Sequence, residues 1–379
     1  MIYLDNAATT YPKPECVYVA MDDANRRMGV NAGRGSYKLA REASSLITDT
    51  KNELRKLVHA ESSAAVVFTP SITIALNQII HGIEWRNGAT VYVSPYEHNA
   101  VARTIHHVSK EYKLNVQLLP INEETLEIDL EKMKYQFSKE KPFAVLCTHV
   151  SNVTGYILPV KEIFEEAKKY DAITVLDSAQ SLGLIDVDVR QFPADIIGFA
   201  GHKCLYGPFG IGGFINITNL KLNEYLTGGT GSDSLNLDMP DGNETKYEAA
   251  SSNIAAIAGL NAALKDLDVK KCFNHEKELT NRVIDGLKKN GNIKMYLPLD
   301  LNKHIGIVSF IYNGLNSEDV GTILDEDFDI AVRTGYHCAP FIHDFLGDKK
   351  SLGTIRVGLS QFSTCEDVDN LLAALVDLV

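Results

Sequence analysis

The stretch ITVLDSAQSLGLIDVDVRQFPADIIGFAGHK, residues 173–203, decides the fold class of this chain. It contains two short apolar runs, 173–177 and 195–200, and each leads into a turn with polar residues or glycine. Strands that are apolar on both faces are typical of a mostly parallel sheet covered by helices on both sides. Ligands of such sheets bind beyond the carboxyl ends of the strands, so we expect Asp177 and Lys203 to face one crevice.

The same alternation of strands and helices extends upstream of this stretch. Apolar runs predict strands at 65–68, 90–94, 116–119 and 143–148, and helical periodicity follows them up to 83 and at 99–109, 129–137 and 160–170. This βαβ rhythm indicates an α/β fold. After residue 218 the pattern changes, with a polar loop at 226–244, helices at 254–267, 275–288 and 317–326, strands at 306–312, 331–333 and 354–358, and a closing helix from 366. The last third is therefore expected to form a smaller α+β domain.

Composition narrows the class of protein. The 379 residues are 45% hydrophobic and 23% charged, which predicts a globular chain of two or three domains and excludes collagen-like, disordered and coiled-coil classes. The net charge of −12 and the absence of a long basic run argue against nucleic acid as a partner. The six cysteines are dispersed without a C-x-x-C pair, and no long apolar segment or secretory signal is visible. We therefore expect a cytoplasmic protein with reduced thiols, no bound metal and no membrane span.

Two residues of the opening stretch suggest a specific chemistry. A partly desolvated lysine at a strand end, as expected of Lys203, is a nucleophile that can form a Schiff base with an aldehyde. A carboxylate in the same crevice, as expected of Asp177, stays ionised when it meets a cation such as a protonated pyridine nitrogen. Each residue taken alone also has an ordinary explanation, a solvated loop lysine and an aspartate that caps the next turn.

Further polar residues follow other predicted strands. Thr73 and the N–H groups at the helix start after Thr69 could bind an anion, although Ser71 could simply cap the helix. The imidazole of His98 could stack on an aromatic cofactor, and Asn152 could donate to a ring oxygen. Any one of these residues could equally be structural.

The C-terminal part adds a thiol and two arginines. Cys338 follows His337 and lies five residues after Arg333, so positive charge could favour its thiolate, although a lone cysteine is more often a small buried residue. Arg356 lies within a predicted strand, where its guanidinium could bind a carboxylate in two-point fashion or form a structural ion pair. The polar surroundings of Cys338 favour an exposed loop.

Taken together, seven motifs make the chain resemble class V cysteine desulfurases, which depend on pyridoxal phosphate (PLP). In order they are LDNAATT, YEHN, HVSNVTG, DSAQ, GHK, RTGYHCA and IRVGLS, and they run from residue 4 nearly to the final helix. The short RTGYHCA segment is similar to that of the SufS-type branch, which is related to selenocysteine lyases. The resemblance implies PLP fold type I, with a large cofactor-binding domain at 15–255 and a small domain built from 1–14 and 256–379.

The resemblance also implies the reaction and its partners. L-cysteine or L-selenocysteine would be the substrate. With L-cysteine the products would be L-alanine and a persulfide on Cys338, whose sulfur passes to an acceptor protein, as in iron–sulfur cluster assembly. A homodimer is implied because the region 226–253 would reach the neighbouring subunit's cofactor.

The resemblance implies a role for each matching residue. Lys203 would bind the cofactor aldehyde and move the substrate Cα proton, Asp177 would pair with the ring nitrogen, and His98 would stack on the ring and handle protons. The ring oxygen would accept hydrogen bonds from Gln180 and Asn152, and the phosphate would be bound by Ile72, Thr73, His202 and the neighbour's Ser251. The substrate would be bound by Arg356, Arg333 and Asn152, and Cys338 would accept the sulfur, with His98 or His337 as its base. The chain departs from the family pattern at Ala200, Ile72, Ala250 and Ser252, so fewer side chains would bind the phosphate.

Three other readings remain open from the sequence. The first is a selenocysteine lyase on the same scaffold. The second is a PLP-dependent aminotransferase or lyase in which Cys338 is a bystander. The third is a thiol or metal-binding protein that uses His337, Cys338 and His343, although these residues lack a fourth ligand at the usual spacing.

Overall fold

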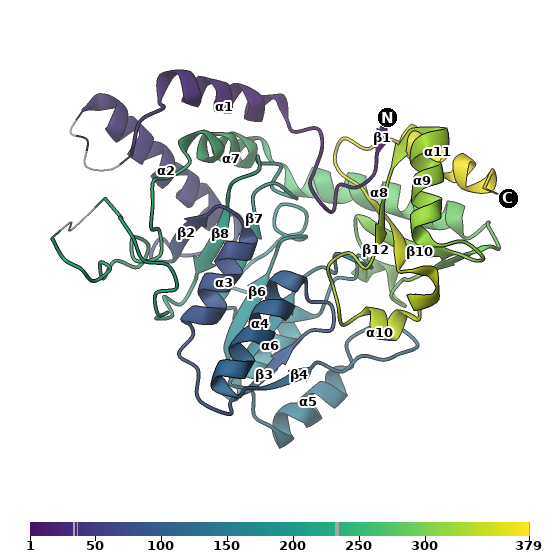
Figure 1. Ribbon diagram of the computed structural model, residues 1–379, viewed down its shortest axis with the longest axis horizontal. Helices are drawn as coiled ribbons and strands as arrows, with labels where there is room; N and C mark the ends of the chain where they lie inside the picture. Colours follow the sequence, from purple (N-terminus) through teal and green to yellow (C-terminus); the bar gives the residue numbers. More distant parts are fainter. Residues whose placement is uncertain (33–34, 36, 232–234, 379) are drawn as a thin grey trace.

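The computed structural model describes residues 1–32, 35, 37–231 and 235–378, and its largest unit is a seven-stranded sheet (Figure 1). The strand order is β2-β8-β7-β6-β5-β3-β4. The bounds are β2 Ala65–Thr69, β3 Thr90–Val93, β4 Asn115–Leu118, β5 Ala144–Thr148, β6 Ile173–Asp177, β7 Ile196–Ala200 and β8 Gly212–Asn216. Neighbouring strands from β7 through β4 are parallel, whereas β8 is antiparallel to both β2 and β7.

Helices cover both faces of this sheet because successive side chains on each strand point to opposite sides. On β5, for example, Val145 packs into one core and its neighbour Leu146 into the other. The first core contains residues of α2 (Lys38–Leu57), α5 (Leu130–Lys139), α6 (Val160–Lys168) and α7 (Ile254–Asp266), and the second contains residues of α3 (Ile72–Gly82) and α4 (Asn99–Tyr112). Helix α1 (Glu15–Arg27) packs on α7. The strands other than the half-buried edge strand β4 are therefore largely buried on both sides, as their apolar runs predict.

Two helices that begin at the carboxyl ends of strands start beside the site described below. Ser71 caps α3 by accepting a hydrogen bond from the backbone N–H of Ile74, and His98 caps α4 by accepting one from Ala100. Both capping residues have extended backbones, as a residue that leads from a strand into a helix requires. The first N–H groups of both helices therefore point toward the strand ends.

The C-terminal part forms a second, antiparallel sheet with the order β12-β13-β10-β9. Its strands are β9 Ile293–Met295, β10 Ile307–Tyr312, β12 Arg333–Gly335 and β13 Thr354–Gly358, and its helices are α8 Val269–Leu287, α9 Ser317–Phe328, α10 His343–Leu346 and α11 Cys365–Val376, with 3₁₀ turns at Leu301–Lys303 and Lys349–Ser351. Leu4 packs into the core of this part, and β1 (Ile2–Tyr3) pairs in parallel with β11 (Ile330–Ala331). The beginning and the end of the chain thus share one core.

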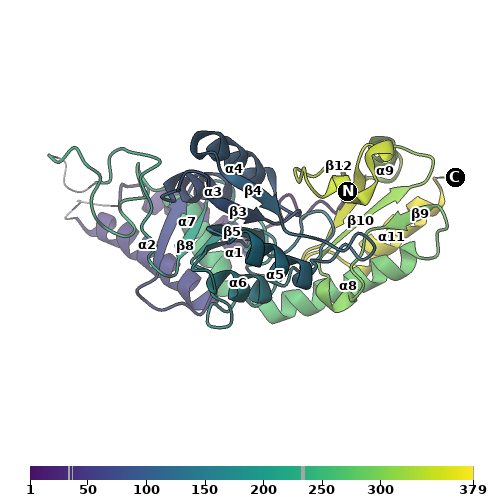
Figure 2. The ribbon, with the colours of Figure 1, turned by 90° about the horizontal axis from the view of Figure 1, so that it is seen from below.

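Figure 2 shows these two parts as neighbouring lobes, with α8 running along the underside from one to the other. Within the residues described, none of the helices is both long and apolar enough to cross a membrane.

The predicted fold class is confirmed, and several elements differ from the expectation in detail. The strand predicted at 331–333 is two strands, β11 and β12, because residues on either side of Val332 pair with different partners, β1 and β13. The helix predicted from 275 begins six residues earlier, at Val269, where Asp268 caps it. Strand β8 and helices α1 and α2 were not foreseen, and in β8 the pair Gly212 and Gly213 hides the strand pattern.

Candidate active site

One cavity of about 200 Å³ lies at the carboxyl ends of β5, β6 and β7, where the two lobes meet. Its lining contains eleven of the twelve residues that the sequence singles out for the site, which are Ile72, Thr73, His98, Asn152, Asp177, Gln180, His202, Lys203, Arg333, Cys338 and Arg356. Three lining side chains are cationic and one is a carboxylate. The cavity therefore suits a ligand that carries negative charge.

Lys203 and Asp177 both line this cavity, and their charges interact. Burial lowers the pKa of the Lys203 amine, and the nearby Asp177 carboxylate partly opposes that effect. Burial likewise raises the pKa of Asp177, while the N–H of Ala179, at 2.9 Å from Oδ1, and the Lys203 charge act in the opposite direction. A buried carboxylate of this kind is stabilised by a cationic partner, and an amine with a lowered pKa is a competent nucleophile.

A cradle for an anion lies at the start of α3. The backbone N–H groups of Ile72 and Thr73 open this helix of 11 residues, and the side chain of Thr73 reaches the cavity. β8 approaches closely at this point, because a Cβ on Gly212 would lie 2.7 Å from the Ile72 nitrogen. The Nδ1 atom of His202 is buried with no protein partner among the residues described. Helix N-termini bind phosphate groups in this way.

The imidazole of His98 is neutral and of one tautomer. Its Nδ1 accepts a hydrogen bond from the Ala100 N–H at 3.0 Å, so the ring hydrogen sits on Nε2. Burial, together with the charges of Lys203 and Arg333, lowers the pKa of His98 to about 4. At neutral pH this ring therefore offers an N–H, and its Nδ1 lone pair is not free to remove a proton.

The amides of Gln180 and Asn152 join the cavity to other segments of the chain. Gln180 Nε2 donates to the Ala7 carbonyl at 2.7 Å, and Asn152 Nδ2 donates to the His337 carbonyl at 2.7 Å. Each amide nitrogen carries a second hydrogen that these contacts do not use. Both side chains can therefore fix the cavity wall and still donate to a ligand.

The two arginines and the thiol lie on the small-lobe side of the cavity. Arg356 is 2% exposed, and its guanidinium donates to Asp5 Oδ1 at 2.7 Å and to the Asn152 carbonyl at 2.9 Å, whereas its Nε is buried without a partner among the described residues. Arg333 Nη2 lies 3.9 Å from the sulfur of Cys338, which is exposed. An anion bound here would meet two guanidinium groups and a thiol.

The N-terminal segment supplies contacts that the sequence did not reveal. Asp5 is the ion-pair partner of Arg356, although 351 positions separate them. Lys13 Nζ donates to the His202 carbonyl at 2.7 Å, next to Lys203, and burial lowers the pKa of Lys13 to about 7. The LDNAATT motif was part of the resemblance, but its contacts span the fold and leave no trace in local spacing.

Glu97 was also missed, although its neighbour His98 was singled out. It is fully buried, and its Oε1 accepts hydrogen bonds from Ser94 at 2.5 Å and from the Thr148 N–H at 2.6 Å. Burial raises the pKa of Glu97 to about 8. The signal that could have found it is a glutamate at the end of an apolar strand, where only a hydrogen-bonded carboxyl is tolerated.

One predicted site residue lies outside the cavity of its own chain. Ser251 is exposed, and its hydroxyl accepts a hydrogen bond from Asn31 at 3.3 Å. The preceding residue, Ala250, has a φ of +93°, a conformation that favours glycine. A role for Ser251 at a neighbouring subunit's cofactor stays a prediction.

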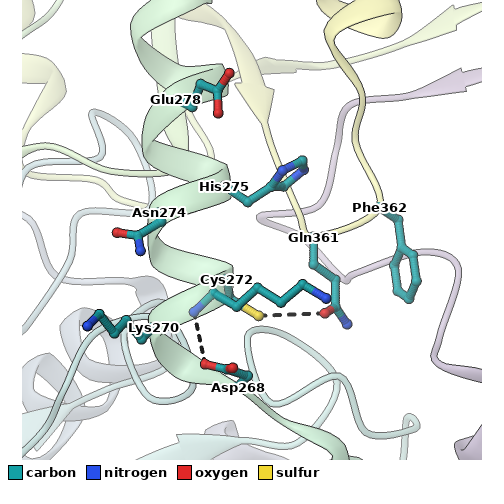
Figure 3. A pocket seen from close by; sticks show the side chains of 9 residues that line it. Asp268, Lys270, Cys272, Asn274, His275, Glu278, Gln361 and Phe362 are labelled. Carbon is teal, nitrogen blue, oxygen red and sulfur yellow. Dashed lines mark hydrogen bonds between the residues drawn. The ribbon is translucent and has the colours of Figure 1, made fainter.

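A second cavity of about 760 Å³ is larger, but it lacks the predicted site residues (Figure 3). It lies against α8 and includes Cys272, whose thiol donates to Gln361 Oε1 at 3.6 Å and whose pKa burial raises to about 11. None of the residues that the sequence singled out for the site lines it. Over the described residues, no group of three His, Cys, Asp or Glu side chains could hold a metal ion, and this includes His337, Cys338 and His343.

Comparisons with known proteins agree with this geometry. The profile of the aminotransferase class-V family matches residues 2–371. A probable cysteine desulfurase of Pyrococcus abyssi is 33% identical over 100% of this chain and 94% of its own length, and one of Halalkalibacterium halodurans is 33% identical over 99% and 92%. Among solved structures, the apo cysteine desulfurase of Thermococcus onnurineus is 30% identical with a TM-score of 0.91, covering 100% of this chain and 94% of that one. These proteins resemble the chain from end to end.

Proposed function

The chain belongs to the aminotransferase class-V family, and on that premise we propose that it is a PLP-dependent cysteine desulfurase. The observation that carries the proposal is the cavity itself. It brings an amine with a lowered pKa, a buried carboxylate, an arginine pair and an exposed thiol to one place from distant parts of the chain, through Lys203, Asp177, Arg333, Arg356 and Cys338. This set matches the removal of sulfur from an amino acid.

The cavity residues suit PLP on structural grounds. The N–H groups of Ile72 and Thr73 and the unpartnered Nδ1 of His202 match a phosphate group. The buried Asp177 carboxylate matches a protonated pyridine nitrogen, and Lys203 matches an aldehyde. When bound, PLP supplies an aldehyde that condenses with amines and a ring that delocalises the electron pair left at the substrate Cα.

The remaining chemistry belongs to the chain's own residues. Asp177 would hold a proton on the pyridine nitrogen of bound PLP, because a buried carboxylate favours a cationic partner. Lys203 takes the proton from the substrate Cα once its amine is free. Arg356 binds the substrate carboxylate with the N–H groups that Asp5 and the Asn152 carbonyl leave unused. His98 presents its Nε2–H to the cavity as a donor.

Cys338 is proposed as the sulfur acceptor. Its thiolate sulfur bonds to the substrate sulfur while the bond from that sulfur to Cβ breaks, and Cβ then gains a proton. The products are alanine and a persulfide on Cys338, so no external oxidant or reductant is needed. The Arg333 guanidinium lies 3.9 Å from this sulfur, so a positive charge adjoins the group that attacks.

The wider context of the enzyme is part of the same proposal. We propose that the cofactor-binding domain begins at residue 15 and that 1–14 and the C-terminal part form the small domain, which the packing of Leu4 into the C-terminal core supports. Helix α7 packs into the core of the large sheet, so the small domain begins after this helix and not at 256. A homodimer, a protein acceptor for the persulfide sulfur and a role in iron–sulfur cluster assembly follow from the family. The six free thiols support a reducing compartment such as the cytoplasm.

Product analysis tests this function against its alternatives. The protein loaded with PLP is incubated with L-cysteine, and the amino acid and keto acid products are separated. Alanine with persulfide sulfur supports the desulfurase, whereas a keto acid without sulfur release supports an aminotransferase and contradicts it. The ratio of kcat/KM for cysteine and selenocysteine decides between a desulfurase and a selenocysteine lyase.

A further inference from the structure

The loop that carries Cys338 has a backbone conformation that few side chains adopt. The φ angle is +47° at His337 and +58° at Cys338, so two consecutive residues other than glycine are left-handed. Such a conformation persists only where the surrounding structure fixes it, and it is concentrated at functional sites. The contacts that fix this loop therefore determine where the Cys338 thiol points.

Three successive carbonyl oxygens of the loop each have a partner from elsewhere in the chain. The partners are His343 Nε2 for Tyr336 at 2.9 Å, Asn152 Nδ2 for His337 at 2.7 Å, and the backbone N–H of Asn99 for Cys338 at 2.7 Å. Asn152 lines the cavity, and Asn99 begins helix α4 beside it. His343 lies outside the cavity and has no role in the proposed reaction.

His343 is held in turn by Asp348. Both side chains are buried, with exposed fractions of 3% and 0%, and His343 Nδ1 lies 2.6 Å from Asp348 Oδ2. Both ring nitrogens thus face oxygen atoms, one of a carboxyl group and one of a carbonyl. A neutral imidazole has only one N–H. The pair satisfies both contacts when an imidazolium faces a carboxylate, or when a protonated Asp348 donates to Nδ1. In either state Nε2 carries the hydrogen that Tyr336 accepts.

Other contacts make the pair rigid. The Tyr336 ring packs edge-on against the His343 ring, with 5.0 Å between their centroids. The Asp348 carbonyl accepts hydrogen bonds from the backbone of Ser351 at 3.0 Å and of Gly353 at 3.1 Å, immediately before β13. The pair therefore links the Cys338 loop to the strand that carries Arg356.

We propose that His343 and Asp348 are positioning residues for the sulfur-transfer step. They fix the Tyr336 carbonyl, and through it they hold Cys338 in its left-handed conformation at the edge of the cavity. The kinetic part of this inference rests on the proposed function, because Cys338 must meet the substrate sulfur. The conformational part does not, because it concerns only the loop.

Two substitutions at one position separate the hydrogen bond from the packing. His343→Phe keeps the aromatic contact with Tyr336 but removes the donor, whereas His343→Gln keeps an N–H near the place of Nε2. Because a misplaced reacting group loses rate steeply, His343→Phe is expected to lower kcat for alanine formation by about tenfold or more. The KM for L-cysteine and the absorbance of bound PLP stay unchanged. His343→Gln and Asp348→Asn, whose amide can donate to Nδ1, stay close to wild type.

Hydrogen–deuterium exchange of the peptide covering 334–346 gives a readout that does not depend on turnover. Exchange is expected to rise in His343→Phe and to stay at the wild-type level in His343→Gln. If His343→Phe does not fold, the double variant His343→Leu, Asp348→Ala replaces it, since it leaves no unpaired buried charge.

Two results would overturn the inference. One is a wild-type kcat together with wild-type exchange in His343→Phe, which lacks the donor. The other is a loss in His343→Gln as large as in His343→Phe. A wild-type enzyme that forms no alanine contradicts the proposed function instead, and the exchange comparison still tests the loop.

Discussion

Arg333 and Arg356 are direct partners across the antiparallel pair of β12 and β13. Like charges placed directly opposite one another destabilise a sheet. Asp5 pairs with Arg356, but Arg333 has, among the described residues, only the thiol of Cys338 as a recorded partner. Two cations in the wall of one cavity therefore form a site that is completed by an anion, and the carboxylate of an amino acid is the anion that the proposed reaction provides.

Replacing Arg356 should weaken substrate binding. A hydrogen bond to a charged group contributes about 1.5–3 kcal/mol, so Arg356→Gln is expected to raise the KM for L-cysteine roughly 10- to 150-fold, with a smaller effect on kcat. Arg356→Lys keeps the charge but loses the two-point geometry, so its KM should lie between those of the wild type and Arg356→Gln. Steady-state kinetics measures the effect, and an unchanged KM in Arg356→Gln would exclude a role in binding the carboxylate.

Removing Asp5 should destabilise the fold. Arg356 is almost fully buried, and a buried charge that loses its partner costs about 3–5 kcal/mol. Because Asp5 is partly exposed, we expect Asp5→Ala to lower the free energy of unfolding by about 3 kcal/mol in urea titrations. Asp369→Ala is the control, since Asp369 pairs with Arg282 at an exposed position. Equal stability of the two variants would show that water already compensates Arg356.

Cys338→Ala should separate cofactor binding from sulfur transfer. The variant is expected to bind PLP with the wild-type absorbance, because Cys338 is exposed at the cavity edge, and to form no persulfide from L-cysteine. Cys365→Ala is a matched control, because Cys365 is also exposed but lies at the start of α11. Desulfuration that continues in Cys338→Ala would remove this thiol from the mechanism.

His149 should make stability depend on pH. Its side chain is buried, its Nδ1 has no protein partner among the described residues, and burial lowers its pKa from about 6.5 to about 4. Between these two pKa values the unfolded chain binds a proton at His149 and the folded chain does not. The free energy of unfolding therefore falls as the pH decreases from about 6.5 toward 4. One such group costs about 2 kcal/mol between pH 7 and pH 5.

The measurement for His149 is a difference between two proteins. His149→Gln cannot titrate in this range, so its free energy of unfolding should fall by about 2 kcal/mol less than that of the wild type between pH 7 and pH 5. Parallel pH dependence in the two proteins would mean that His149 is not buried in its neutral form.

The sequence predicted the central sheet well because most of its strands are marked by a local pattern of apolar residues. Strands β2, β3, β5, β6 and β7 are largely apolar runs, and residues that follow them reach the cavity because parallel strands end at one edge. Strand β8 escaped notice because Gly212 and Gly213 have poor strand propensity, although they are needed where β8 passes close to α3 and β2.

The partners of the site residues could not be read from the sequence in the same way. Asp5 meets Arg356 only because the segment after β1 pairs with the end of β13, through a bridge between Asp5 and Gly358. His343 meets Tyr336 and Asp348 only because the loop after β12 folds back on itself. Spacing along the chain does not encode such contacts. The residue types indicated the chemistry of the site, whereas the fold determined which other side chains orient the site residues.

Lys203→Ala should abolish the covalent attachment of PLP. The absorbance of the bound aldehyde and its fixation to the chain by borohydride reduction are both expected to disappear, while Lys270→Ala, at an exposed position on α8, should retain them. Fixation that persists in Lys203→Ala would place the attachment on another amine.

Mapping the transferred sulfur tests the central claim most directly. The wild-type protein, loaded with PLP, is treated with one equivalent of L-cysteine, alkylated without reductant and digested for mass spectrometry. We predict that the peptide containing Cys338 gains the mass of one sulfur atom, that the peptides of the other five cysteines do not, and that alanine appears in equal amount. Alanine formed without added sulfur on Cys338, or no alanine at all, would contradict the account.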